Sequence, residues 1–253
     1  MDDYKEMLEE NLAHLKDLAK DGDRFYEYEY GMALLTNDEY DEAIKYLESS
    51  SSKGYEDATY CLGLCYEQGI CFDQDIEKAK EYYNELVKKN SGYGYKGLAD
   101  LLFYGDTSNK EKMEALSLYE KGALKTMSNY YYCNYELGSI YRRGIFVKKD
   151  MTKAVEYFLI ANEEMVEPEM TLTLGLAYLN GKYGLEKDLT KAHDLLLEFL
   201  FEVTDEETDL IEEFNKETKK CKDEDFLNKL YLDAKNRKDE CDEDCECHHH
   251  HQG

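Results

Sequence analysis

The chain has 253 residues, of which 42% are hydrophobic and 35% are charged, and it carries a formal net charge of −26 with one proline and no tryptophan. A surface this negative repels phosphate backbones and anionic lipid head groups, so no nucleic acid or membrane partner is expected. A single proline leaves long stretches free to remain helical, and no apolar run approaches the roughly 20 residues that span a bilayer. The composition therefore favours a helix-rich protein outside the membrane.

The first predicted element is a helix within residues 1–22, where apolar side chains recur at helical spacing between Tyr4 and Ala19. We expect this helix to cap the array that follows, because the outer face of a terminal repeat must be covered. The segment Met1–Glu6 has no basic start and no apolar core behind it, which argues against a secretory signal. The expected location is cytoplasmic.

Five similar segments follow, with bounds at residues 23–54, 55–90, 91–127, 128–165 and 166–201. The three clearest copies, Tyr60–Gly69, Tyr135–Gly144 and Thr173–Gly181, share Leu-Gly, Tyr and Gly at equal offsets. A motif that recurs at a fixed period indicates helix-pair repeats that stack on their neighbours. The motif is expected on the first helix of each pair.

The second helix of each pair has its own pattern. Asp75, Asp150 and Asp188 each precede an alanine by four residues, and an aspartate there accepts hydrogen bonds from the first free N–H groups of a helix. The alanines recur 36 to 39 residues apart and are followed by bulky side chains; they are Ala43, Ala79, Ala115, Ala154 and Ala192. Each faces a small residue of the first helix, Gly31, Gly63, Ala99, Gly138 or Gly175, so the two backbones can approach closely.

This combined motif resembles the Sel-1-like repeat, a longer-looped relative of the tetratricopeptide repeat. The resemblance covers roughly residues 23–201 and implies an all-α fold, a right-handed α-solenoid superhelix of about five helix-pair repeats. It also implies a non-enzymatic scaffold or adaptor for protein partners. The first copy departs from the pattern, because only 12 residues separate Gly31 from Ala43, and the third copy replaces the glycine with Ala99.

Two further amphipathic helices are predicted within residues 202–238, one around Leu210 and Phe214 and one around Phe226 and Leu230. We expect them to cap the other end of the array. Residues 239–253 have no apolar periodicity and are expected to form a disordered acidic tail.

Catalytic motifs for nucleotide binding, serine hydrolysis and zinc proteolysis are absent from the sequence. Outside the tail the only histidines are His14 and His193, which lie at opposite ends of the predicted array, so a histidine-based catalytic set would lack partners. We therefore expect no catalytic residues and no cofactor. The resemblance leaves one enzymatic alternative, because cysteine-rich relatives have been proposed to hydrolyse β-lactams; it is the least favoured.

The tail offers a second alternative, since Cys241, Cys245, Cys247 and His248 could bind zinc, copper or nickel. A run of four histidines near a terminus is also typical of an expression remnant, and a native metal site is not the preferred interpretation. Cys61, Cys65 and Cys71 lie close together in the sequence, and we interpret them as free thiols of the core.

If the copies pack as in the family, the first helices line a concave groove that binds the partner. The residues that face it are Tyr28, Met32, Tyr60, Glu67, Gln68, Tyr93, Lys96, Phe103, Tyr104, Tyr132, Tyr135, Arg142, Arg143, Leu172 and Asn180. Tyrosine and arginine are favoured anchors at protein interfaces. The alternative is that tyrosine, with 24 copies in the chain, simply fills solvated faces.

Three of these groove residues, Lys96, Arg142 and Arg143, are basic in a strongly acidic protein. They predict a local positive patch, and with it a partner peptide that carries a carboxylate or an acidic side chain.

Overall fold

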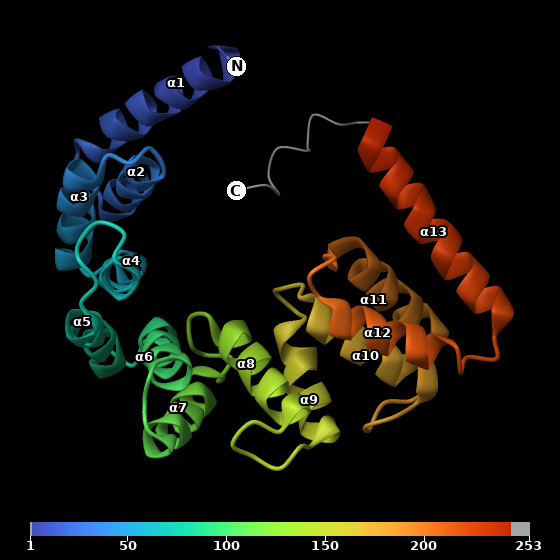
Figure 1. Ribbon diagram of the computed structural model, residues 1–253. Helices are drawn as coiled ribbons and strands as arrows, with labels where there is room; N and C mark the ends of the chain where they lie inside the picture. The colour runs from blue at the N-terminus through green and yellow to red at the C-terminus, as the bar shows by residue number, and fades with distance from the viewer. Residues whose placement is uncertain (1, 244–253) are drawn as a thin grey trace. The chain divides into compact units, whose positions relative to one another are not determined.

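The computed structural model describes the backbone of residues 2–243 and the side chains of residues 10–238. Within that range the chain forms thirteen α-helices and no β-strand (Figure 1). It divides into two compact units, residues 1–133 and residues 134–253. None of the described helices combines the length and the apolar character that a membrane crossing requires.

Unit 1 consists of a single N-terminal helix and three helix pairs. Its helices are α1 (Asp2–Ala19), α2 (Arg24–Thr36), α3 (Tyr40–Ser52), α4 (Glu56–Gln68), α5 (Ile76–Lys88), α6 (Gly92–Tyr104) and α7 (Asn109–Gly122), followed by the start of α8 (Tyr130–Arg143). The first helices α2, α4 and α6 lie side by side, and α3, α5 and α7 form a second row (Figure 1). Helix α1 packs on α2 through Ala19.

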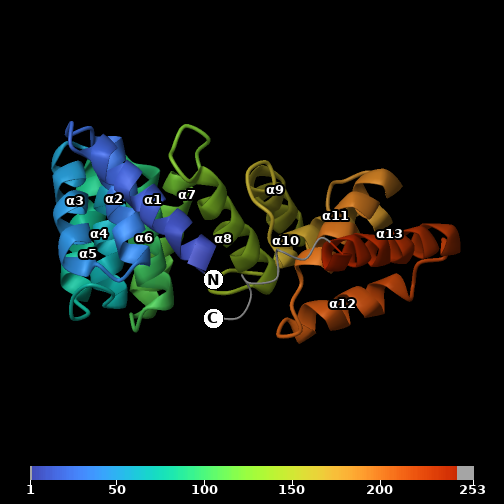
Figure 2. The ribbon, with the colours of Figure 1, turned by 90° about the horizontal axis from the view of Figure 1, so that it is seen from above.

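Unit 2 contains most of α8 together with α9 (Met151–Ala161), α10 (Pro168–Asn180), α11 (Leu189–Glu202), α12 (Thr208–Thr218) and α13 (Glu224–Glu243). Helix α12 packs on α10, and α13 packs along α11 (Figure 2). Each unit is thus a stack of helix pairs, and the chain is an α-solenoid of helix-pair repeats, as predicted.

The predicted helix starts are confirmed at all three aspartates. The carboxylate of Asp75 accepts a hydrogen bond from the backbone N–H of Lys78, and Asp150 and Asp188 do the same for the second and third residues of α9 and α11. The third copy, which lacks the aspartate, begins α7 with a capping box between Ser108 and Glu111. A different pair of residues therefore satisfies the same free N–H groups.

The Leu-Gly motif marks a close contact within a helix pair. A Cβ atom on Gly63 would lie only 2.5 Å from the ring of the fully buried Tyr83, and one on Gly175 would lie 2.7 Å from Leu196. Because these contacts leave no space for a methyl group, the glycine lets the second helix place a large side chain directly against the first.

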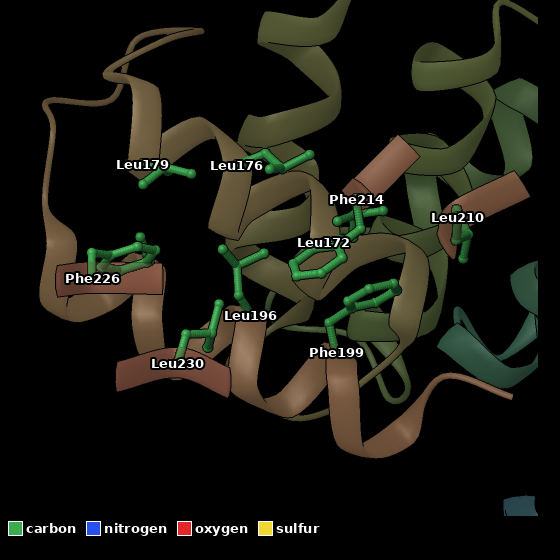
Figure 3. Close-up of a cluster of buried hydrophobic side chains, with 10 residues drawn as sticks. Leu172, Leu176, Leu179, Leu196, Phe199, Leu210, Phe214, Phe226 and Leu230 are labelled. Carbon is green, nitrogen blue, oxygen red and sulfur yellow. The ribbon is translucent and has the colours of Figure 1, made fainter. Parts of the chain in front are cut away.

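A buried apolar cluster closes the C-terminal end of unit 2. Leu172 of α10 and Phe199 of α11 pack with Phe214 of α12, and Phe226 and Leu230 of α13 complete the cluster (Figure 3). Burying one such side chain stabilises the fold by about 1.5–3 kcal/mol. Helices α12 and α13 therefore belong to the same core as the last repeat.

The predicted boundary of the C-terminal tail needs a correction. Residues 239–243 were expected to be disordered, yet they form the last part of α13, which ends at Glu243. These residues contain no glycine or proline that would stop a helix. The rest of the predicted tail lies outside the described residues.

Candidate partner-binding surface

A row of aromatic side chains crosses the first helices of unit 1. We call this set the tyrosine face; it consists of Tyr28, Tyr55, Tyr60, Tyr93, Lys96 and Tyr132. The ring centroids of Tyr28 and Tyr55 are 5.1 Å apart, and those of Tyr60 and Tyr93 are 5.2 Å apart. Most of these rings are half-buried, and Tyr132 is 38% exposed. The structure thus brings four of the predicted groove tyrosines together and adds Tyr55, which precedes α4.

Lys96 lies within the tyrosine face and is already paired. Its ammonium is 5.2 Å from the ring centroid of Tyr132 and 5.9 Å from that of Tyr60, and it donates to the Asp100 carboxylate at 2.5 Å. Burial disfavours the charged ammonium, but Asp100 and the Tyr60 hydroxyl outweigh that penalty and raise the pKa of Lys96. The cation is therefore held by the chain itself.

Two carboxylates near the face are hydrogen-bonded by tyrosine hydroxyls. Tyr93 donates to Asp57, and the buried Tyr83 donates to Glu67. Burial raises the pKa of the Glu67 carboxyl, and the hydrogen bond from Tyr83 opposes that shift. Burial also raises the pKa of the Tyr28 hydroxyl to about 12. A neutral hydroxyl satisfies a carboxylate without cancelling its charge, so this surface keeps a negative character.

The two predicted arginines of unit 2 are bound to internal carboxylates. Glu169, only 3% exposed, accepts from Arg142 at 2.8 Å and from two nitrogens of Arg143 at 2.9 Å. Arg142 also donates to Glu213 of α12 at 2.6 Å and to Thr173. The predicted positive patch is therefore corrected, because these arginines, like Lys96, are neutralised within the chain.

Two further groove predictions need correction for a different reason. Leu172 is fully buried, because α12 covers this position of α10. Phe103 is also buried, with its ring 6.1 Å from that of Tyr119 on α7. Neither side chain is available to a partner in this structure.

The remaining predicted residues occupy varied positions. Met32 is half-buried, with its sulfur 3.4 Å from the Cys61 thiol, and Tyr135 is half-buried with its ring 5.9 Å from that of Phe158. Three are exposed, namely Gln68, Tyr104 and Asn180. Tyr104 stands out, because 66% of this large side chain is accessible.

An open pocket in unit 1 adjoins the tyrosine face and was only partly predicted. Its volume is about 740 Å³. We call it the loop pocket; it is lined by Glu67, Gln68, Gln74, Ile76, Lys80, Asp100, Leu101, Tyr104, Gly105, Asp106, Thr107 and Glu111. Glu67, Gln68 and Tyr104 follow from the helix register. Asp100 and Leu101 also lie on the first helix α6, and the other residues come from loops and from the second helices. None of these was predicted as a groove residue.

The cysteines of the second copy belong to the core, as interpreted from the sequence. Cys61 and Cys65 are buried, and Cys65 Sγ lies 3.7 Å from Cys71 Sγ with no disulfide between them. Among the residues that the structure describes, no group of three histidine, cysteine or acidic side chains is placed to hold a metal ion. The weak metal candidates Cys241, Cys245, Cys247 and His248 fall outside the described side chains.

Comparison with solved structures shows similar folds at low identity. A Sel1 repeat protein from Oxalobacter formigenes is 20% identical with a TM-score of 0.59, over 77% of this chain and 84% of that one. A Sel1 repeat protein from Klebsiella pneumoniae is 23% identical with a TM-score of 0.51, over 82% and 99%. The antigen c5321 of uropathogenic Escherichia coli is 21% identical with a TM-score of 0.63, over 89% of this chain and 47% of its own. Identities this low establish a shared fold only.

No curated protein matches the chain. The family model of the Sel1 repeat does match, at residues 17–55, 57–91, 93–126, 132–164 and 173–198. These five segments cover more than half of the chain, and each includes parts of both helices of an observed pair. The chain therefore belongs to the Sel1 repeat family.

Proposed function

We propose that this protein is a non-enzymatic scaffold that binds a partner protein along the tyrosine face of unit 1. Sel1 repeats generally serve as protein-interaction scaffolds, and that general role is the starting point. The observation that carries the proposal is the continuous row of half-buried tyrosines on the first helices. Such rings offer a large contact area while losing little conformational freedom on binding.

The polar groups of the face support the same role. Lys96 and Asp57 are held in place by Asp100 and by the Tyr93 hydroxyl, so the surface is ordered before a partner arrives. A preordered surface loses less conformational entropy on binding than a mobile one, and the difference strengthens the complex.

Affinity capture from the native cell tests the proposal. The bait is the full chain, compared with the Tyr93→Ala/Tyr132→Ala variant by quantitative mass spectrometry. Removing two interface rings should reduce recovery of the specific partner by about tenfold or more. The control is Tyr183→Ala/Tyr231→Ala, which removes two exposed tyrosines from unit 2. If the two variants recover the same proteins as the wild type, the tyrosine face is not the binding surface.

A further inference from the structure

The loop pocket lies where two neighbouring repeats of unit 1 meet. Gln74 and Ile76 reach it from the start of the second copy's second helix, and Gly105 and Thr107 reach it from the connection between α6 and α7. Its volume of about 740 Å³ lies in the range of sites that enclose a ligand group. The pocket is therefore large enough to accept one or two side chains of a bound peptide.

Part of its lining is apolar and accessible. Tyr104 is 66% exposed and Ile76 is 37% exposed, and both line the pocket beside the buried Leu101. Large apolar groups that share one concavity gain the most when another apolar group covers them. The lining thus favours an occupant with a bulky apolar side chain.

The charged part of the lining is mainly acidic. Glu67, Asp106 and Glu111 line the pocket together with one lysine, Lys80. Asp100 also lines it, but its two oxygens accept from Lys96 at 2.5 Å and from the Tyr119 hydroxyl at 2.7 Å. The ammonium of Lys80 pairs with Glu77 at 2.8 Å, and the partner of Glu67 is an uncharged tyrosine hydroxyl. The pocket therefore complements a positive charge, and the long-range field of a chain with net charge −26 attracts the same kind of partner.

The pocket is continuous with the tyrosine face. Asp100 lines the pocket and also accepts the hydrogen bond from Lys96, whose ammonium lies over the rings of Tyr60 and Tyr132. A peptide on the tyrosine face can therefore place a side chain in the pocket without leaving the surface. This continuity favours a protein segment over a free small molecule.

From these observations we infer that the loop pocket binds a peptide segment in which a lysine or arginine stands next to a bulky apolar residue. The inference rests on the proposed scaffold function and reverses the charge predicted for the partner. The apolar side chain packs against Tyr104 and Ile76, and the cation lies near Asp106.

A phage library of random twelve-residue peptides, selected on the full-length protein, tests the inference. We expect enrichment of peptides that pair Arg or Lys with Leu, Ile, Phe or Tyr. Synthetic copies should bind the Tyr104→Ser/Asp106→Lys variant at least about tenfold more weakly than the wild type. The matched control is Tyr183→Ser/Glu186→Lys, which makes the same kinds of change in the α10–α11 loop and should leave binding unchanged.

Tyr104 and Asp106 are both exposed, and circular dichroism will check that the Tyr104→Ser/Asp106→Lys variant is folded. If it is not, the exposed Gln68→Lys replaces it, with a loss of binding still expected. Enrichment of acidic peptides, no enrichment, or equal binding to the folded variant would each overturn the inference. The scaffold proposal is judged separately, because its capture experiment alters Tyr93 and Tyr132, which do not line the pocket.

Discussion

The last repeat of unit 2 uses an equivalent position in the opposite way from the repeats of unit 1. In unit 1, the position three residues before the small residue of the first helix holds Tyr28, Tyr60 and Lys96, which remain partly accessible. In unit 2, the last copy holds Leu172 there, and α12 covers it completely. The comparison teaches that the repeat register determines which way a side chain points, whereas the neighbouring helices determine whether it meets solvent or core.

The largest expected loss of stability comes from a substitution in α12, the helix that covers Leu172 in unit 2. Replacing Phe214 by Ala should reduce the free energy of unfolding by about 3–5 kcal/mol, because a cavity forms beside Leu172 and Phe199. Urea denaturation measures the change. The control Leu232→Ala, on the 58% exposed face of α13, should stay within about 0.5 kcal/mol of the wild type. Equal effects of the two substitutions would mean that α12 does not belong to this core.

The second prediction concerns the buried carboxylate of unit 2. Replacing Glu169 by Ala should cost about 3 kcal/mol of unfolding free energy, because Arg142 is only 11% exposed and loses a partner at 2.8 Å. The comparison substitution is Glu198→Ala, whose pair with Arg237 is about one-third exposed and should cost about 1 kcal/mol or less. Both values come from urea titrations. A loss below about 1 kcal/mol for Glu169→Ala would contradict the structural role of this pair.

A third prediction uses the half-buried tyrosine of unit 1. The pKa of Tyr28 is raised to about 12 by burial, so the folded state keeps its proton at a pH where the unfolded chain ionises near 10. This contribution to stability is complete below pH 10 and is lost as the pH rises towards 12. The unfolding free energy of the wild type should fall between pH 9 and pH 11. In Tyr28→Phe this fall should be smaller by about 1 kcal/mol or less, as measured by urea denaturation at the two pH values. An unchanged difference between these pH values would contradict the raised pKa.

The smallest effect on stability is expected for Lys96→Met. Its pair with Asp100 is partly exposed, with 18% and 22% of the two side chains accessible, so the loss should be about 1 kcal/mol or less. The substitution also makes the loop pocket more negative. Synthetic basic peptides should therefore bind a few-fold more tightly in fluorescence titrations at low salt. Weaker binding would indicate that Lys96 itself contacts the peptide.

The sequence was sufficient for the parts of the fold that depend on local pattern. Leu-Gly followed by Tyr marked the first helices, and Asp75, Asp150 and Asp188 marked the starts of second helices, because capping and close approach each need particular residues. The third copy was found despite Ala99, since the spacing to Ala115 was kept.

The candidate surface was less predictable, because it depends on contacts between elements that are distant in sequence. The partner of Arg142 is Glu169, 27 residues away, and the cover over Leu172 comes from Phe214. The contact between Arg142 and Glu169 had one signal in the sequence. Glu169 is the only charged residue between Glu169 and Asn180, and a single charge in such an apolar segment needs a partner when it is buried. The loop pocket gave no such signal, because two repeats build it jointly.

Helix α12 shows how an amphipathic helix can pack on a first helix of these repeats. It presents Leu210 and Phe214 to the core beside Leu172, and it offers Glu213 to Arg142. Helix α12 therefore binds α10 as a peptide ligand would: two apolar side chains enter the core, and one negative charge pairs with an arginine of the surface. Under the scaffold function proposed above, a peptide ligand for the tyrosine face would copy this arrangement with the charge reversed.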